Sequence, residues 1–144
     1  MAEGLLSPLL AHPCPPTTAA APNPPQVVSV GDFRIGVCHG HQVVPWGDRG
    51  ALAILQRRLD AAILVTGHTH RVAAYQDEGR VVINPGSATG AYSAAAAADA
   101  APSFVLLDVE GRRATVYIYE LAGEEVKVDK LEFSKGAAAA TALR

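Results

Sequence analysis

Residues 33–70 read "FRIGVCHGHQVVPWGDRGALAILQRRLDAAILVTGHTH", and this stretch predicts a strand, a helix and a second strand. Phe33–Cys38 is mostly apolar, which is typical of a strand buried on both faces. Asp48 is a candidate N-cap for a helix through "RGALAILQRRLD", and "AAILVTG" is the second strand. The apolar side chains that share one face of that helix are Ala51, Leu52, Leu55 and Leu59. Such a βαβ unit makes its two strands parallel.

Four of the five histidines lie in two tetrapeptides, "CHGH" at 38–41 and "GHTH" at 67–70. His39 follows the first strand of the βαβ unit, and His68 and His70 follow the second. In open α/β sheets the carboxyl ends of parallel strands form one edge, where ligands bind. We therefore expect these imidazoles at a common rim, with His41 beside them.

Three neutral imidazoles on one rim suit a transition metal ion such as zinc or manganese. The alternative is that the rings hydrogen-bond loop carbonyls, but the clustering of four histidines beside glycines favours the metal. A hydrolytic two-metal centre also needs bridging carboxylates. We find no Asp-x-His at a strand end. The other oxygen-bearing side chains that could bind a metal each have a structural explanation. Asp32 and Asp77 lie in hairpin turns, Asp48 and Asp60 lie at helix ends, and Asn84 precedes Pro85-Gly86 in a turn.

The rest of the chain indicates one domain within residues 26–134, preceded by a disordered Pro/Ala-rich segment, 1–25, and followed by a flexible tail, 135–144. "QVVSV" forms a hairpin with the first βαβ strand through Gly31-Asp32. "RVAAYQDEGRVVINPGS" and "SFVLLDVEGRRATVYIYEL" are two more hairpins, and "EVKVDKLEF" is the last strand.

Composition limits the possible functions. The 144 residues carry a net charge of −2 with 18% charged side chains, which gives no basic patch for nucleic acid. The sequence contains no apolar run near the roughly 20 residues that span a bilayer, and the N-terminus lacks the basic region of a signal peptide. Cys14 and Cys38 form neither a metal-type spacing nor a disulfide framework, which fits a reducing, cytoplasmic setting.

The blocks "HGHQVVPWGD", "DAAILVTGHTH" and "INPGSATGAY" resemble the calcineurin-like metallophosphoesterase family, and within it the branch that serves as a subunit of retromer. The resemblance covers about residues 26–134 and implies an α/β fold, a partial β-sandwich with flanking helices. It also implies His39, His68 and His70 as ligands of one weakly held divalent ion, zinc or manganese, with His41 near the site. Family members begin with a βαβ portion that contains Asp-x-His, and residues 1–25 show no counterpart of it.

The resemblance further implies a non-catalytic scaffold subunit that binds the helical-solenoid subunit of retromer through its metal-site face. Such a subunit is cytoplasmic, peripheral on endosomes, and works in cargo transport to the Golgi or plasma membrane without inserting into the bilayer. The expected partner-binding residues are Val43, Val44 and Trp46. The expected groove for Pro-Leu-bearing regulators is formed by Leu106, Tyr117, Tyr119 and Val128, for which ordinary β-core is the alternative. The alternative function is a metal-dependent phosphodiesterase or phosphatase.

Overall fold

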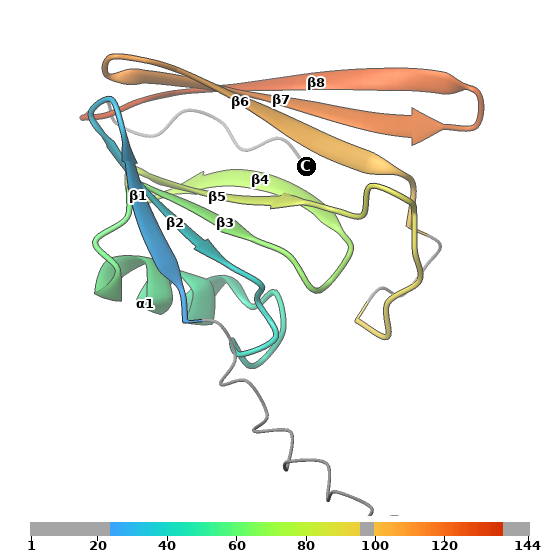
Figure 1. The fold of residues 1–144 in the computed structure, drawn as a ribbon, viewed down its shortest axis with the longest axis horizontal. Coiled ribbons are helices and arrows are strands. Elements are labelled where there is room, and N and C mark those ends of the chain that lie inside the picture. The colour runs from blue at the N-terminus through green and yellow to red at the C-terminus, as the bar shows by residue number, and fades with distance from the viewer. Residues whose placement is uncertain (1–23, 96–99, 137–144) are drawn as a thin grey trace, which may run out of the picture.

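The computed structural model describes residues 24–95 and 100–136, which form two β-sheets and a helix (Figure 1). The segment predicted to be disordered, residues 1–25, and the tail predicted to be flexible, residues 135–144, lie almost wholly outside the described residues. Both predictions therefore stay untested. No helix within the described residues is long and apolar enough to cross a bilayer. The elements in chain order are β1 (Gln26–Val30), β2 (Phe33–Cys38), α1 (Arg49–Arg58), β3 (Ile63–Thr66), β4 (Val72–Asp77), β5 (Arg80–Pro85), β6 (Ser103–Glu110), β7 (Arg113–Ala122) and β8 (Glu125–Ser134).

The larger sheet has the strand order β1-β2-β3-β5-β4. Strands β2, β3 and β5 run parallel, while β1 and β4 pair antiparallel at the two edges. The predicted βαβ unit is confirmed, because β2 and β3 are parallel neighbours joined through α1. All three hairpins are confirmed as well.

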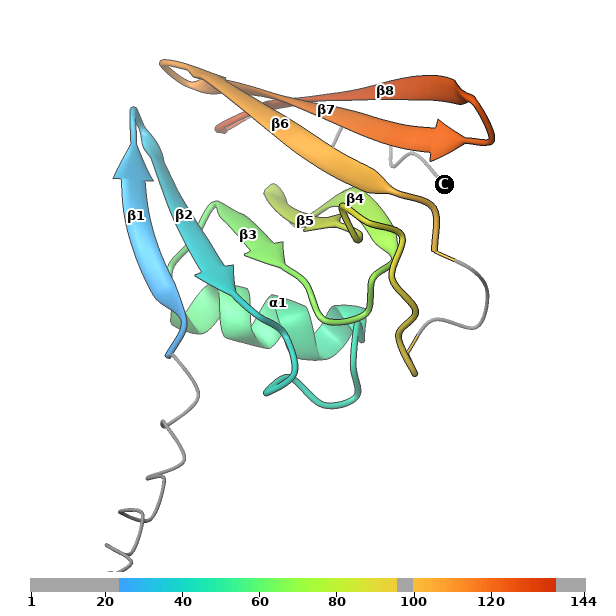
Figure 2. The same ribbon diagram turned by 45° about the vertical axis from the view of Figure 1, so that its right-hand side comes forward.

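Helix α1 packs on one face of this sheet, as Figure 2 shows from the side. It starts where predicted: the Asp48 carboxylate accepts a hydrogen bond from the backbone N–H of Ala51 at 2.8 Å. Gly36 makes the close approach possible, since a Cβ there would lie 3.1 Å from the Leu59 side chain. The predicted apolar face contacts the sheet through Leu52, which is buried, and through Ala51, Leu55 and Leu59.

The smaller sheet, in the order β6-β7-β8, lies across the opposite face of the larger one (Figure 1). Strand alternation directs one set of its side chains inward, and Val116 and Phe133 are buried against Phe33 and Ile63. The Phe33 and Phe133 rings are 5.6 Å apart between centroids. This interface between the sheets is the main core of the described chain.

Strand β1 is the least covered element, because all five of its residues are exposed. Val28 pairs with Ile35 of β2, yet Val28 is 49% exposed while Ile35 is 5% exposed. Val37, farther along β2, is 43% exposed. The interface between the sheets therefore leaves apolar surface uncovered at the β1 edge.

Candidate functional site

The two histidine tetrapeptides meet at the carboxyl ends of β2 and β3, as predicted. Cys38 and Thr66 are the last residues paired between these strands, and the loops beyond them are joined by a hydrogen bond from Gly67 N–H to the His39 carbonyl, at 3.0 Å. The parallel register therefore carries His39 and His68 to the same rim.

Three imidazoles gather there: His39, His41 and His68. The His39 and His68 ring centroids are 5.2 Å apart, and those of His41 and His68 are 6.1 Å apart. The Nδ1 atoms of His39 and His41 lie 2.9 Å apart, so one ring donates a proton and the other accepts it. His41 is therefore a member of the cluster, whereas the sequence predicted it only as a neighbour of the site.

His70, the third predicted ligand, is held differently. Its Nδ1 donates a hydrogen bond to the Ala91 carbonyl at 2.8 Å. A carbonyl partner of this kind orients many metal-binding histidines. Among the described residues, the His70 ring makes no ring contact with His39 or His68, although His70 is near enough to His68 to help lower the pKa of that residue.

Asn84 positions the "GHTH" turn, and sequence reasoning missed this role. Its buried amide donates to the Gly67 carbonyl at 3.2 Å and to the Thr69 hydroxyl at 2.9 Å, and its carbonyl accepts from Gly86 N–H. The sequence predicts a turn at "INPG", and the bond from Gly86 N–H to the Asn84 side chain bears this out, although Asn84 itself lies within β5. Its partners are 15 and 17 residues away, so no local pattern identifies them.

His68 has the most perturbed environment of the cluster. Its Nε2 is buried without a hydrogen-bond partner among the described residues. Burial, and then the nearby His39, His41 and His70, lower the pKa of His68 from its ordinary value. The ring is therefore neutral at physiological pH, with an unsatisfied nitrogen.

The side chains at the rim supply only some of the ligands that a complete metal centre needs. A neutral imidazole with a free nitrogen is a good transition-metal ligand. However, no group of three or more His, Cys, Asp or Glu side chains within residues 24–95 and 100–136 is arranged to hold an ion. We therefore assign no chemical step to a metal.

The loop after His41 gives the rim its apolar character, with one correction to the prediction. Val44 is 73% exposed and Trp46 is 49% exposed. Trp46 Nε1 donates to the His41 carbonyl at 3.1 Å, and its ring lies 4.4 Å from that of His68. Val43 was predicted to contact a partner, but its side chain is only 8% exposed and packs in the core cluster under α1 that includes Leu52.

The predicted groove residues lie on the outward side of the β6-β7-β8 sheet. Leu106 pairs with Tyr117, and Tyr119 pairs with Val128. Leu106 and Val128 are each about half exposed, at 53% and 52%, so the core alternative is wrong for them. The same outer face holds three exposed apolar residues that sequence reasoning did not select: Phe104, Leu121 and Val126. Phe104 stacks on Tyr119, with centroids 4.6 Å apart.

Residues 17–135 match the calcineurin-like phosphoesterase superfamily domain. The chain belongs to this superfamily. The predicted α/β fold class is confirmed, with two sheets and a helix in the described part of the chain.

Within the superfamily the chain is similar to proteins called Vps29. It is 45% identical to vacuolar protein sorting-associated protein 29 of Schizosaccharomyces pombe over 75% of this chain and 59% of that protein. It is 48% identical to the zinc complex of Entamoeba histolytica Vps29, with a TM-score of 0.73 over 76% of this chain and 61% of that one. For Cryptosporidium parvum Vps29 the identity is 48% and the TM-score 0.74, over 77% and 57%.

The chain thus spans about three fifths of the length of these phosphoesterase-like relatives. The resemblance predicted from the sequence motifs is confirmed, including its partial extent. The zinc in the Entamoeba histolytica structure belongs to that protein.

Proposed function

We propose that this chain is a non-catalytic scaffold subunit of retromer, which binds the helical-solenoid subunit through the histidine rim. The observation that carries this proposal is the pair Val44 and Trp46, two large apolar side chains exposed at 73% and 49% on that rim. Trp is a frequent anchor of protein interfaces, and an exposed aliphatic neighbour extends the contact. In this role the chain is cytoplasmic and reaches endosomes through its complex, in cargo transport to the Golgi or plasma membrane.

The chemistry of the rim supports a docking role over a catalytic one. His39 pairs with His41, and His70 pairs with a backbone carbonyl. The Asp48 carboxylate, which follows the rim loop in the chain, caps α1, and the Asp60 carboxylate pairs with Arg34 and Arg80 before β3, at the amino ends of the parallel strands. A two-metal hydrolase needs carboxylates beside its imidazoles, because carboxylates bridge the two ions.

A pull-down with the helical-solenoid subunit of retromer tests the interface. Val44→Asp places a charge at the most exposed apolar position of the rim, and we expect binding to fall at least about tenfold. Ile54→Asp is the matched control, because Ile54 is a 59% exposed aliphatic side chain on α1, away from the histidines. Equal binding by the parent chain and Val44→Asp would contradict the proposal.

A phosphodiesterase or phosphatase is the alternative, and an activity assay distinguishes it. We expect no turnover of bis-p-nitrophenyl phosphate with manganese added, because no group of three or more His, Cys, Asp or Glu side chains in the described part of the chain is arranged to hold an ion. Turnover that His70→Ala abolishes would replace the scaffold proposal with the enzymatic one. His12 belongs to neither histidine tetrapeptide, and His12→Ala serves as the control for general loss of imidazole.

The outer face of the β6-β7-β8 sheet is proposed as a second docking surface, for a Pro-Leu-bearing segment of a regulator. Phe104, stacked on Tyr119, and Leu106 beside Tyr117 supply a continuous apolar surface. Leu106→Asp should abolish binding of a Pro-Leu peptide measured by fluorescence anisotropy, whereas Ile54→Asp should not. Undiminished peptide binding by Leu106→Asp would exclude this surface.

A further inference from the structure

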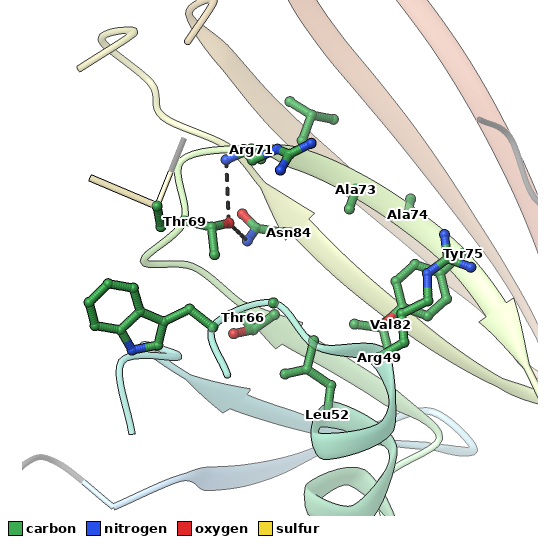
Figure 3. A pocket seen from close by; sticks show the side chains of 14 residues that line it. Arg49, Leu52, Thr66, Thr69, Arg71, Ala73, Ala74, Tyr75, Val82 and Asn84 are labelled. Atoms are coloured by element: carbon green, nitrogen blue, oxygen red, sulfur yellow. Dashed lines mark hydrogen bonds between the residues drawn. The ribbon is translucent and has the colours of Figure 1, made fainter. Parts of the chain in front are cut away.

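A hollow of about 390 Å³ lies between α1 and β4, on the helix side of the larger sheet. Figure 3 shows Leu52 of α1 on one side and Ala73, Ala74 and Tyr75 of β4 on the other. A volume of this size suits a small organic ligand. The hollow is lined by none of the four rim histidines, so it is distinct from the rim's imidazole cluster.

Two guanidinium groups, those of Arg49 and Arg71, give the hollow a positive charge. Arg49 lies over the Tyr75 ring, 4.4 Å from its centroid. Neither arginine forms an ion pair within the described residues, although Arg34, Arg57 and Arg80 all do. The described lining contains no Asp or Glu, although the carboxylates of Asp48 and Asp77 lie near enough to Tyr75 to act on its hydroxyl.

Tyr75 supplies a second, independent indication of a ligand. Its side chain lines the hollow and reaches from β4 toward α1 (Figure 3), and the residue is only 6% exposed. Its hydroxyl is buried with no hydrogen-bond partner among the described residues. A buried polar group without a partner is costly, and native structures seldom leave one. Burial also raises the pKa of Tyr75, so the hydroxyl keeps its proton and can donate it.

The other walls are apolar. Leu52 and Val82 are buried in its wall, and the half-exposed Trp46 side chain also lines the hollow. The neighbouring amide and hydroxyl groups of Asn84 and Thr69 already bond to each other. The free polar groups are therefore the two guanidiniums and the Tyr75 hydroxyl, set against an apolar floor.

We propose that this hollow binds a small organic anion, a carboxylate or phosphate ester on an aromatic or aliphatic body. Arg49 and Arg71 bind the anionic group, the Tyr75 hydroxyl donates a hydrogen bond to it, and Leu52, Val82 and Trp46 contact the body. Guanidinium pairs with carboxylate and phosphate in a two-pronged geometry, which explains why two unpaired arginines suit this ligand class.

Titration of the ¹⁵N-labelled full chain by NMR tests the site with benzoate, phenyl phosphate and neutral benzyl alcohol. We expect at least one anion to saturate shifts at Arg71, Tyr75 and neighbouring β4 residues, and benzyl alcohol to bind about tenfold more weakly or not at all. Saturation by benzoate alone identifies a carboxylate ligand, and saturation by phenyl phosphate alone identifies a phosphate ester. No saturation by either anion at about 10 mM, or equal binding of benzyl alcohol, would overturn the proposal.

Variants separate specific binding from general charge attraction. Arg49→Gln and Arg71→Gln should each weaken anion binding about tenfold, whereas Arg58→Gln, which removes an exposed charge from the same helix, should change it less than about twofold. An equal loss of anion affinity in Arg58→Gln would mean that net charge attracts the anion nonspecifically, and it would overturn the proposal.

Tyr75→Phe distinguishes a ligand-binding role of the hydroxyl from a role in the stability of the fold. Removing an unpaired buried hydroxyl should leave the ligand-free chain as stable as the parent or more stable, while anion binding weakens. A variant that unfolds more easily and binds the anion as well as the parent would show that the hydroxyl serves the fold, and would overturn its assignment.

Discussion

Gly40 is the residue that allows the two histidine tetrapeptides to lie together. Its φ of +101° lies in a region that L side chains rarely adopt. A Cβ at Gly40 would stand 2.5 Å from the Thr66 hydroxyl and 3.0 Å from the Gly67 carbonyl oxygen. The His39 and His68 loops can therefore approach only with glycine at this position.

Gly40→Ala should lower the free energy of unfolding by about 2–4 kcal/mol, because strained backbone and overpacking both contribute. Gly79→Ala is the matched control: φ at Gly79 is +75°, but an added Cβ meets no described atom within 4 Å. That variant should cost about 1 kcal/mol, from the backbone alone. Urea denaturation measures the free energy of unfolding of both variants. Equal losses of stability would contradict the close approach of Gly40 to Thr66 and Gly67.

His68 should make the stability of the chain depend on pH. The folded-state pKa of His68 is lowered, so between that pKa and the unfolded value of about 6.5 the unfolded chain binds more protons. The contribution of the neutral ring is fully present above about pH 6.5 and is lost as pH falls toward the folded pKa. Urea midpoints at about pH 7.5 and 5.5, in buffer with a chelator, should fall more for the parent than for His68→Gln. Identical pH profiles for the two chains would rule out this role.

At the scale of elements, α1 illustrates a structure that local chemistry specifies. Its N-cap and its apolar face were both predicted from the sequence. The structure adds a basic last turn, Arg57 and Arg58, which suits the negative end of the helix dipole. Each strand was likewise recognisable from its apolar pattern and flanking turns. The order of strands was not, because β5 pairs with β3 in parallel although β4 lies between them in the chain.

Asp48→Ala should destabilise the chain by about 1 kcal/mol, since the Ala51 N–H loses its acceptor. Asp48→Asn retains a side-chain acceptor and should lose less, roughly the helix-dipole contribution of 0.3–1 kcal/mol at most. Thermal denaturation followed by circular dichroism compares the two. A loss as large in the asparagine variant as in the alanine variant would assign the effect to charge.

The molecule as a whole is an incompletely covered sandwich. Its core between the sheets is well packed around Phe33 and Phe133, but β1 is exposed throughout and Val28 and Val37 remain open to solvent. An uncovered edge strand with apolar side chains weakens the fold and invites association.

The purified chain should therefore be marginally stable, with a broad thermal transition below about 45 °C. A saturating partner that binds only the folded state should raise the midpoint. Circular dichroism with and without the helical-solenoid subunit measures this effect, and Val44→Asp, which should bind at least about tenfold more weakly, is the control. A sharp, high-temperature transition of the isolated chain would show that the open edge costs little.

Sequence alone determined the elements, the carboxyl-end placement of the histidines and the family, because caps, turns and apolar periodicity act over a few residues. Tertiary structure alone decided which of those side chains meet. It turned His70 to the Ala91 carbonyl, buried Val43, placed Asn84 under the "GHTH" turn and left the Tyr75 hydroxyl unpaired in a hollow. These outcomes depend on strand order and on backbone angles such as those of His68 and His70, where φ is +69° and +54°. Both follow from the balance of contacts between segments far apart in the chain, which no short stretch of sequence contains.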